Sequence, residues 1–277
     1  ATVANARSPK EILQYVKVVV GPTTVTLMAT DMENGIRIQV DGVDREQVGE
    51  ALLPVARVGL ILRECRDQSI TIRTDKFETI IETTSSNFKL PTANPNEYPN
   101  VEGFREDAYH EVSARTLKEM IRRTVFAIDA DSQRFALGGV LFEMNGNEVF
   151  AVGTDGRRLA RQVGTGLSIG GHATTANQTI VPGRSLALVA KAISDLDDDA
   201  KVNVAARSKD IVIDTGRGSV TCRLVEGKYP NWKQVIPSDR KKPTLVDISV
   251  GPLASGIRQA AIVADHETHG LDFLFDE

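Results

Sequence analysis

The chain has 277 residues, 41% of them hydrophobic but only 5% aromatic, and a formal net charge of −4. This length suits two domains better than one, and cores filled mainly by Val, Ile, Leu and Thr are typical of sheet-rich proteins. No apolar run reaches the roughly 20 residues of a membrane span, and no charged-then-apolar signal segment opens the sequence. Cys65 and Cys222 lie far apart inside apolar runs, so we expect two buried, reduced thiols in a soluble cytoplasmic protein.

The first block of predicted elements ends near residue 108. Strands are expected toward the end of residues 10–20, on both sides of Thr30-Asp31 within residues 24–40, and at 69–74 and 78–84. A helix is expected over residues 54–65, PVARVGLILREC, with proline where a helix start tolerates it. The block closes with the phrase FKLPTANPNEYPNV.

The second block begins with a predicted helix over residues 114–128, which places apolar side chains on one face and Arg115, Lys118 and Arg122 on the other. Residues 134–162 predict a hairpin that turns at Asn145-Gly146, followed by the polar corner TDGRRL at 154–159. This corner sets a Leu and small residues beside two Arg, a combination suited to a shallow apolar pocket with a polar rim. A second helix follows Pro182, and strands at 202–206, 211–215 and 219–224 precede the phrase VEGKYPNWKQVIP.

The two blocks repeat each other. Thr30-Asp31 matches Thr154-Asp155, and Tyr98-Pro99-Asn100 matches Tyr229-Pro230-Asn231 in the same order. A third copy starts with ISVGPLASGIRQAAIVAD, which resembles VSARTLKEMIRRTVFAID of the second block. We therefore predict an α+β fold with antiparallel sheets. The expected domains are 1–108 with its opening part missing, 109–243, and the truncated start of a third at 244–277, so the chain is expected to be a fragment.

Basic side chains recur on the helix faces that point away from the predicted cores. Besides the three of the 114–128 helix, they are Arg63, Arg66, Arg184, Lys191 and Arg258. An ordinary solvated face explains any one helix, but the same pattern in four helices of a repeated array favours a positive lining for a polyanion. Such contacts would be directed at phosphates and blind to sequence.

Catalytic chemistry finds little support in the sequence. There is no GxxxxGK[ST] phosphate loop, and His266 and His269 have metal-ligand spacing without a third ligand. The carboxylates of residues 195–199, DLDDD, admit either a divalent-ion cluster or, as we favour, a solvated loop. We predict no metal, no cofactor and no enzyme activity.

Several phrases resemble a known family when taken in order. They are LMATDMENGIR, FKLPTANPNEYPN, RFALGGVLFE, VGTDGRRLA, EGKYPNWKQVIP and ISVGPLASGIRQAAIVAD, and they resemble the bacterial DNA polymerase III beta subunit, the sliding clamp. The resemblance implies repeated DNA-clamp domains, each with two helices and antiparallel sheets, in a head-to-tail homodimer ring. It implies a non-catalytic processivity factor that encircles double-stranded DNA and tethers the polymerase III catalytic subunit. The clamp loader and other polymerases and repair proteins with clamp-binding peptides are the further partners implied.

The resemblance also implies site residues. Partner peptides would bind a groove at Leu137, Thr154, Gly156, Arg157, Arg158, Leu159, Pro230, Gln234 and Val235. DNA would contact Arg63, Arg115, Lys118, Arg122, Arg134, Phe135 and Lys191. The family often has His where Arg157 stands and a basic residue where Gln234 stands, so partner preference is expected to differ.

Two other functions stay open from the sequence. A metal-dependent nuclease would use the 195–199 carboxylates on DNA held by the basic helices, and it would require divalent ions. An open tandem-domain DNA-binding protein would be retained equally on linear and circular DNA, whereas a ring escapes over free ends.

Overall fold

The structure, a computed structural model, describes residues 3–75, 78–130, 135–236, 246–265, 268 and 270–274. The chain divides into two units, Ala1–Trp232 and Lys233–Glu277. The described part of the second unit contains one α-helix, α4 (Val250–Ala261), as the third copy of the repeat predicts. Sheets and the other described helices belong to the first unit.

The first half of the larger unit alternates strands with one helix. Its elements are β1 (Tyr15–Val20), β2 (Val25–Thr30), β3 (Asn34–Val40), β4 (Gly49–Pro54), α1 (Val55–Glu64), β5 (Thr71–Thr74), β6 (Glu78–Glu82) and β7 (Asn87–Pro91), with 3-10 turns at Glu11–Gln14 and Pro95–Glu97. Pro54 is the N-cap of α1, where its missing N–H costs no helical hydrogen bond.

The second half has a longer set of elements. They are β8 (Tyr109–Ser113), α2 (Ala114–Thr124), β9 (Gly139–Asn145), β10 (Glu148–Thr154), β11 (Leu159–Ile169), β12 (Ile180–Pro182), α3 (Gly183–Ala192), β13 (Lys201–Ala206), β14 (Asp210–Asp214) and β15 (Gly218–Arg223), with 3-10 turns at Val125–Ala127 and Phe135–Gly138. A further 3-10 turn, Trp232–Val235, begins at the last residue of the larger unit and continues into the second. Ser113 caps α2 by accepting a hydrogen bond from Thr116 N at 3.2 Å.

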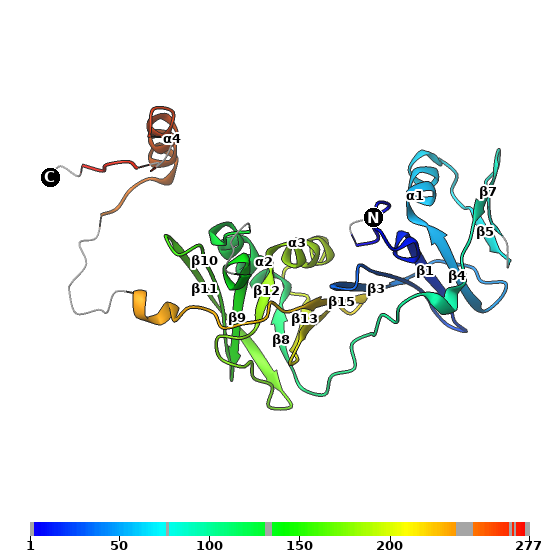
Figure 1. Cartoon of the computed structure of the whole chain (residues 1–277), viewed down its shortest axis with the longest axis horizontal. Helices are drawn as coiled ribbons and strands as arrows, with labels where there is room; N and C mark the ends of the chain where they lie inside the picture. Colours follow the sequence, from blue (N-terminus) through cyan, green and yellow to red (C-terminus); the bar gives the residue numbers. More distant parts are fainter. Residues whose placement is uncertain are drawn as a thin grey trace. The chain divides into compact units, whose positions relative to one another are not determined.

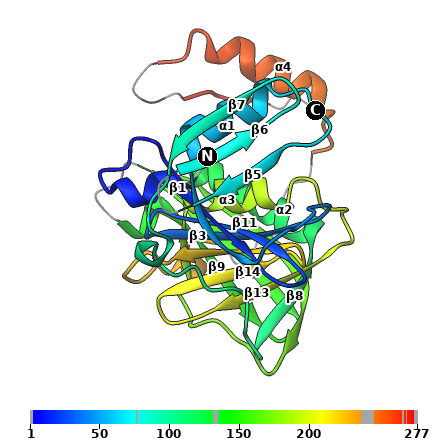
Figure 2. The ribbon, with the colours of Figure 1, turned by 90° about the vertical axis from the view of Figure 1, so that its right-hand side faces the viewer.

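All of the described strand pairs are antiparallel, which confirms the predicted α+β class. Twelve strands form one sheet in the order β12-β9-β10-β11-β8-β13-β14-β15-β3-β2-β1-β4, and β5-β6-β7 form a second. The two halves of the chain meet where β15 pairs with β3, from Gly218 opposite Ile38 to Cys222 opposite Asn34. Figures 1 and 2 show α1, α2 and α3 on one side of these strands.

The order of elements repeats between the halves. β1 to β4, α1 and β5 to β7 correspond to β9 to β12, α3 and β13 to β15. The pair β8 and α2 has no counterpart among the described residues of the first half. The repeat is therefore one of structure as well as of sequence.

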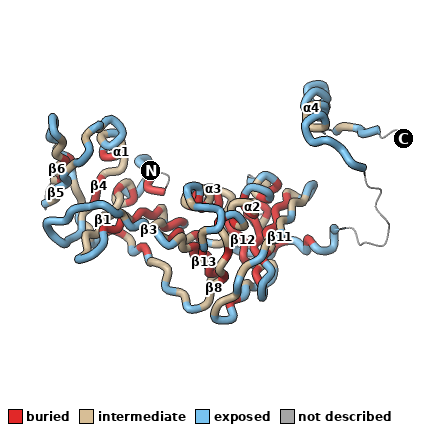
Figure 3. The backbone as a smooth tube through the Cα atoms, turned by 180° about the vertical axis from the view of Figure 1, so that it is seen from behind, coloured by how far each residue is buried: buried red, intermediate tan, exposed pale blue. Residues whose placement is uncertain are grey.

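The main core lies between the second-half sheet and its helices. Leu117, Met120 and Ile121 of α2 pack with Val149 and Ala151 of β10 in one buried cluster. The opposite face of α2, with Arg115 and Arg122, is exposed. Figure 3 shows this buried band running through the second half, with exposed backbone at its rim. The predicted amphipathic pattern of α2 is confirmed.

Some predictions differ from the structure in detail. The hairpin turn is Gly146-Asn147, because Asn145 already pairs with Glu148. The helices end at Glu64, Thr124 and Ala192, so Arg66 lies beyond α1. Cys222 is buried as expected, and burial raises the pKa of its thiol to about 12, but Cys65 is only half-buried because it follows the last residue of α1. None of the helices in the described ranges combines the length and apolarity needed to cross a bilayer.

Candidate functional site

The corner between β10 and β11 is a tightly bonded turn. Thr154 Oγ1 donates to Arg158 O at 2.6 Å and accepts from Gly156 N at 3.0 Å. Asp155 Oδ1 accepts from Arg157 N and Arg158 N, both at 2.9 Å. These backbone hydrogen bonds lower the pKa of the Asp155 carboxyl, so it stays ionised at neutral pH. Gly156 has φ +89°, a conformation that side chains rarely adopt.

The corner between β2 and β3 repeats this hydrogen-bond network. Thr30 Oγ1 donates to Asn34 O at 2.8 Å and accepts from Met32 N, while Asp31 Oδ1 accepts from Glu33 N and Asn34 N. The surroundings differ. At the first corner the edge of β3 is paired with β15, and Glu33 faces Arg184 and Arg223 at 3.9 and 3.8 Å.

The second corner keeps an open strand edge. β8 pairs with β11 only from Gly166 to Ile169, and in the described ranges no strand pairs with residues 159–165 on the side away from β10. The two turns are both exposed, and the corners differ in their strand edges: β3 is paired with β15, whereas the beginning of β11 is not paired on that side within the described ranges.

An apolar cluster, here called the Trp232 cluster, lies beside the second corner. Its buried members are Leu141, Val152, Ile180, Tyr229 and Trp232, and Ala136, Leu159 and Val225 pack against them half-buried. The Tyr229 hydroxyl donates to Val152 O at 3.0 Å, and burial raises the pKa of that hydroxyl far above its usual range. This bond fixes the chain that carries Pro230 against β10.

The structure brings most of the predicted peptide-binding residues together. Thr154, Gly156, Arg157, Arg158 and Leu159 share the corner, and exposed Pro230 directly follows Tyr229. Leu137 is only 5% exposed and lies in the 3-10 turn before β9, next to Ala136, which packs against the Trp232 cluster. Gln234 and Val235 belong to the second unit, and both are exposed.

Three arginines border this surface in different states. Arg158 is bound by Asp155, with Nε 3.0 Å from Oδ2, and lies 5.8 Å from the Phe126 ring. Arg157 is exposed and forms no ion pair with the described carboxylates. Arg161, which the sequence reasoning missed, has its guanidinium carbon 5.0 Å from the Phe150 ring and 5.4 Å from the Trp232 ring. Because side chains alternate along a strand, Arg161 is on the same face as Leu159, and this alternation could have identified it.

The predicted DNA-binding residues lie mostly on exposed helix faces. Arg63 lies in the last turn of α1, and Arg115, Lys118, Arg122 and Lys191 lie on α2 and α3. Phe135 is 77% exposed in the turn before β9, while Arg134 lies outside the described residues. The structure thus places a basic helix layer opposite the Trp232 cluster, because Val149 and Ala151 of β10 face α2 whereas Val152 faces the cluster.

Of the carboxylates in residues 195–199, Asp198 forms ion pairs with basic side chains of α2. Asp198 lies 3.3 Å from Arg115 Nη2 and 3.5 Å from Lys118 Nζ, and Lys118 also donates to Leu196 O at 2.7 Å. Within the described ranges no three His, Cys, Asp or Glu side chains are grouped to hold a metal ion. The other candidate ligands, His266 and His269, lie outside the described residues.

Two models of one protein family match most of the sequence. The DNA polymerase III beta subunit N-terminal domain matches residues 1–102, and the central domain of the same subunit matches residues 111–231. The chain belongs to the DNA polymerase III beta subunit family. The family is that of a DNA sliding clamp, a processivity factor without catalysis of its own, and this is the function of the chain. The metal-dependent nuclease is not favoured.

The alignments with known beta clamps extend over nearly the whole chain. The beta sliding clamp of Pseudomonas aeruginosa is 27% identical over 272 residues, which are 98% of this chain and 72% of that clamp. The Staphylococcus epidermidis clamp is 27% identical over 268 residues, 94% of this chain and 69% of that clamp. The P. aeruginosa clamp bound to griselimycin has a TM-score of 0.84 at 25% identity, covering 97% of this chain and 71% of its own. The Bacillus subtilis clamp, 23% identical with a TM-score of 0.84 and coverage of 96% and 70%, shares the fold.

Proposed function

We propose that this beta subunit binds short peptides of its partners on the second corner and the Trp232 cluster. The observation that carries the proposal is the place of the second corner beside an apolar cluster: the hydrogen-bonded turn leads directly into Leu159, which packs half-buried against the Trp232 cluster. A Helicobacter pylori clamp has been crystallised bound to a DNA ligase peptide. The partners proposed here are the polymerase III catalytic subunit, the clamp loader, and other polymerases and repair proteins.

The chemistry of this surface suits an extended peptide. Leu159 and the half-buried members of the cluster offer apolar contact, while the corner offers Arg157 and exposed backbone. Apolar anchors supply affinity and a few directed polar groups fix orientation. The residues proposed for the site are Leu137, Thr154, Gly156, Arg157, Arg158, Leu159, Pro230, Gln234 and Val235.

We propose that the exposed helix faces contact double-stranded DNA. The residues proposed on the helices are Arg63, Arg115, Lys118, Arg122 and Lys191. Phe135 in the turn before β9 is added to them, as is Arg134, which lies outside the described residues. The pairing of Arg115 and Lys118 with Asp198 supports weak contact, because their charge is already partly compensated. A closed ring is held on DNA by topology, so weak and screened phosphate contacts are enough and allow sliding.

The proposed assembly is a cytoplasmic head-to-tail homodimer ring built from repeated domains. We assign 1–108 to a first domain, 109–243 to a second and 244–277 to the start of a third. The pairing of β15 with β3 supplies a junction that the open edge of β11 would repeat with a following domain. Such head-to-tail use of one junction closes into a ring when the rotation allows it.

The proposed ring is tested with protein loaded by its clamp loader onto nicked circular DNA. Retention on the circle is measured at moderate salt before and after a single cut linearises it. We expect release on cutting, because a ring slides off free ends. Retention that the cut leaves unchanged would favour the open tandem-domain protein and contradict a topological link.

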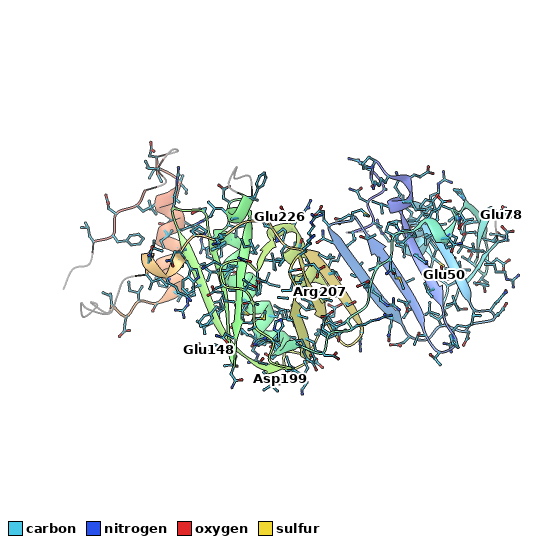
Figure 4. The ribbon with its side chains drawn as sticks, turned by 60° about the horizontal axis from the view of Figure 1, so that its bottom comes forward. Glu50, Glu78, Glu148, Asp199, Arg207 and Glu226 are labelled. Carbon is cyan, nitrogen blue, oxygen red and sulfur yellow. The ribbon has the colours of Figure 1, made fainter. Side chains whose placement is uncertain are left out.

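Asp198→Asn is expected to tighten direct DNA binding. The change frees Arg115 and Lys118 for phosphates, so the slope of log affinity against log salt should steepen by roughly 1–2. Titration of labelled duplex at several salt concentrations measures both quantities. Asp199→Asn is the matched control, because Asp199 (labelled in Figure 4) forms no ion pair with the described residues. Equal effects of both variants would show that net charge alone matters.

A further inference from the structure

We propose that Arg161 is a preorganised receptor for a carboxylate beside the Trp232 cluster, so that the surface prefers peptides carrying an acidic residue next to their apolar anchor. The inference rests on the proposed peptide-binding function and names the kind of peptide preferred. It adds a residue outside the nine assigned to the site above.

Strand register places Arg161 on the face of the cluster. Arg161 of β11 pairs with Val152 of β10, and Leu159 pairs with Thr154. Directly paired residues of antiparallel strands project from the same face. Since Val152 and Leu159 both belong to the Trp232 cluster, the Arg161 side chain rises from the same face and lies beside the proposed apolar anchor site.

Two aromatic rings fix the guanidinium before any ligand arrives. Its carbon lies 5.0 Å from the Phe150 ring and 5.4 Å from the Trp232 ring, and Trp232 is itself 4% exposed and thus firmly held. Arginine stacks on aromatic faces while the N–H groups at its edge stay free to bind a carboxylate. Restricting the side chain in advance reduces the entropy lost when a ligand binds.

The charges around Arg161 leave it available. Arg161 is exposed and forms no ion pair with the described residues, whereas Arg158 is already bound by Asp155 at 3.0 Å. Glu143 is opposite Phe150 on β9, and its carboxylate accepts a hydrogen bond from Asn177 N at 3.4 Å. Arg157 and Arg161 are thus two exposed guanidiniums without an ion pair to the described residues, and each is complementary to a peptide carboxylate.

The position of Arg161 argues against a role in holding duplex DNA. β10 presents Val149 and Ala151 to α2 and Val152 to the Trp232 cluster, so Arg161 lies on the sheet face opposite the basic helices. A polyanion held by the helix layer would be separated from Arg161 by the sheet. A peptide carboxylate is therefore the favoured occupant.

The test selects peptides from a random display library against the full chain and against Arg161→Gln. The wild-type chain is expected to enrich peptides with Asp or Glu at a fixed spacing from an apolar residue, and R161Q to enrich the apolar residue alone. Arg73→Gln is the matched control, an exposed strand arginine paired with Glu82 at 3.8 Å in the first half. R73Q should select as the wild type does.

A double-mutant cycle then uses one selected peptide and its Asp→Asn counterpart. R161Q should weaken the acidic peptide roughly tenfold, the effect of losing a hydrogen bond to a charged group, and leave the amide peptide unchanged. Unchanged acidic enrichment in R161Q would overturn the role of Arg161 while peptide binding stands. If no library yields a peptide whose binding is sensitive to Leu159→Ala, the peptide site itself is overturned. If R161Q loses DNA affinity while its peptide selection is unchanged, Arg161 is reassigned to DNA binding.

Discussion

Gly153→Ala is expected to destabilise the second half of the large unit by about 3 kcal/mol, at the upper end of typical overpacking costs. A Cβ at this position would lie 2.2 Å from Thr124 O and 3.4 Å from Ile128 Cγ2. The first of these is backbone at the end of α2, so no rotamer change relieves the clash. Either α2 or β10 must move, and β10 leads directly into the Thr154 corner.

Urea unfolding followed by fluorescence measures this change, because Trp232 is the single tryptophan and is buried against Val152 of β10. Gly49→Ala in β4 is the control, since its Cβ would meet nothing within 4 Å. We expect that variant to match the wild type within roughly 0.5 kcal/mol. If both variants unfold at the same urea concentration, the close approach of α2 to β10 does not limit stability.

Local patterns and repeats predicted much of this molecule. The amphipathic spacing of α2 and the Thr-Asp corners depend on neighbours along the chain, so the amino-acid order alone is enough to recognise them. The sequence repeat also predicted a structural repeat: Thr30-Asp31 and Thr154-Asp155 have the same residue types and form the same pattern of hydrogen bonds. The family resemblance pointed to the Leu159 and Pro230 surface by the same phrases.

Other features depend on contacts between distant segments. β7 was hidden in a phrase rich in Pro and Asn, which is typical of loops, and only its pairing with β6 makes it a strand. The β15–β3 junction joins residues of two repeats, and nothing in either strand alone indicates it. Arg161 combines a local and a long-range feature. Strand alternation predicts the sheet face on which its side chain lies, but its stacking on Trp232 requires the segment around Trp232 to pack against β10.

A buried histidine pair is a further long-range feature, formed by His110 of β8 and His172 after β11. Their Nδ1 atoms are 2.6 Å apart. Ala206 N donates to His172 Nε2 at 3.0 Å, so the His172 proton is on Nδ1 and is donated to His110. His110 Nε2 then donates to Gly146 O at 3.0 Å. The relay is satisfied only when both rings are neutral, because another proton would put two N–H groups face to face.

Burial lowers the pKa of both rings below the ordinary value of 6.5, and for His172 the nearness of His110 adds to this. The hydrogen bond from His110 to Gly146 O and, at His172, the carboxylate of Glu106 oppose the shift without reversing it. Further charges near this end of the sheets belong to Arg207 (labelled in Figure 4), which lies 3.1 Å from Glu106, 3.5 Å from Asp210 and 3.8 Å from Glu102. The native state therefore binds fewer protons than the unfolded chain in mild acid.

The contribution of the neutral histidine pair to the free energy of unfolding is expected to be fully present above pH 6.5. It should fall as the pH decreases from there toward the native pKa values of the two rings. Two protons taken up on unfolding give a slope of at most about 2.7 kcal/mol per pH unit. Burial raises the pKa of Asp210 and Asp214, which has the opposite effect between their ordinary value of 3.8 and their raised native pKa values. Urea midpoints between pH 5 and 8 measure the slope, and a comparison with a variant that lacks both rings isolates the contribution of the histidines. The double variant His110→Gln and His172→Gln should be less stable at pH 8 yet lose the slope, and a slope that survives in it would assign the titration to other groups.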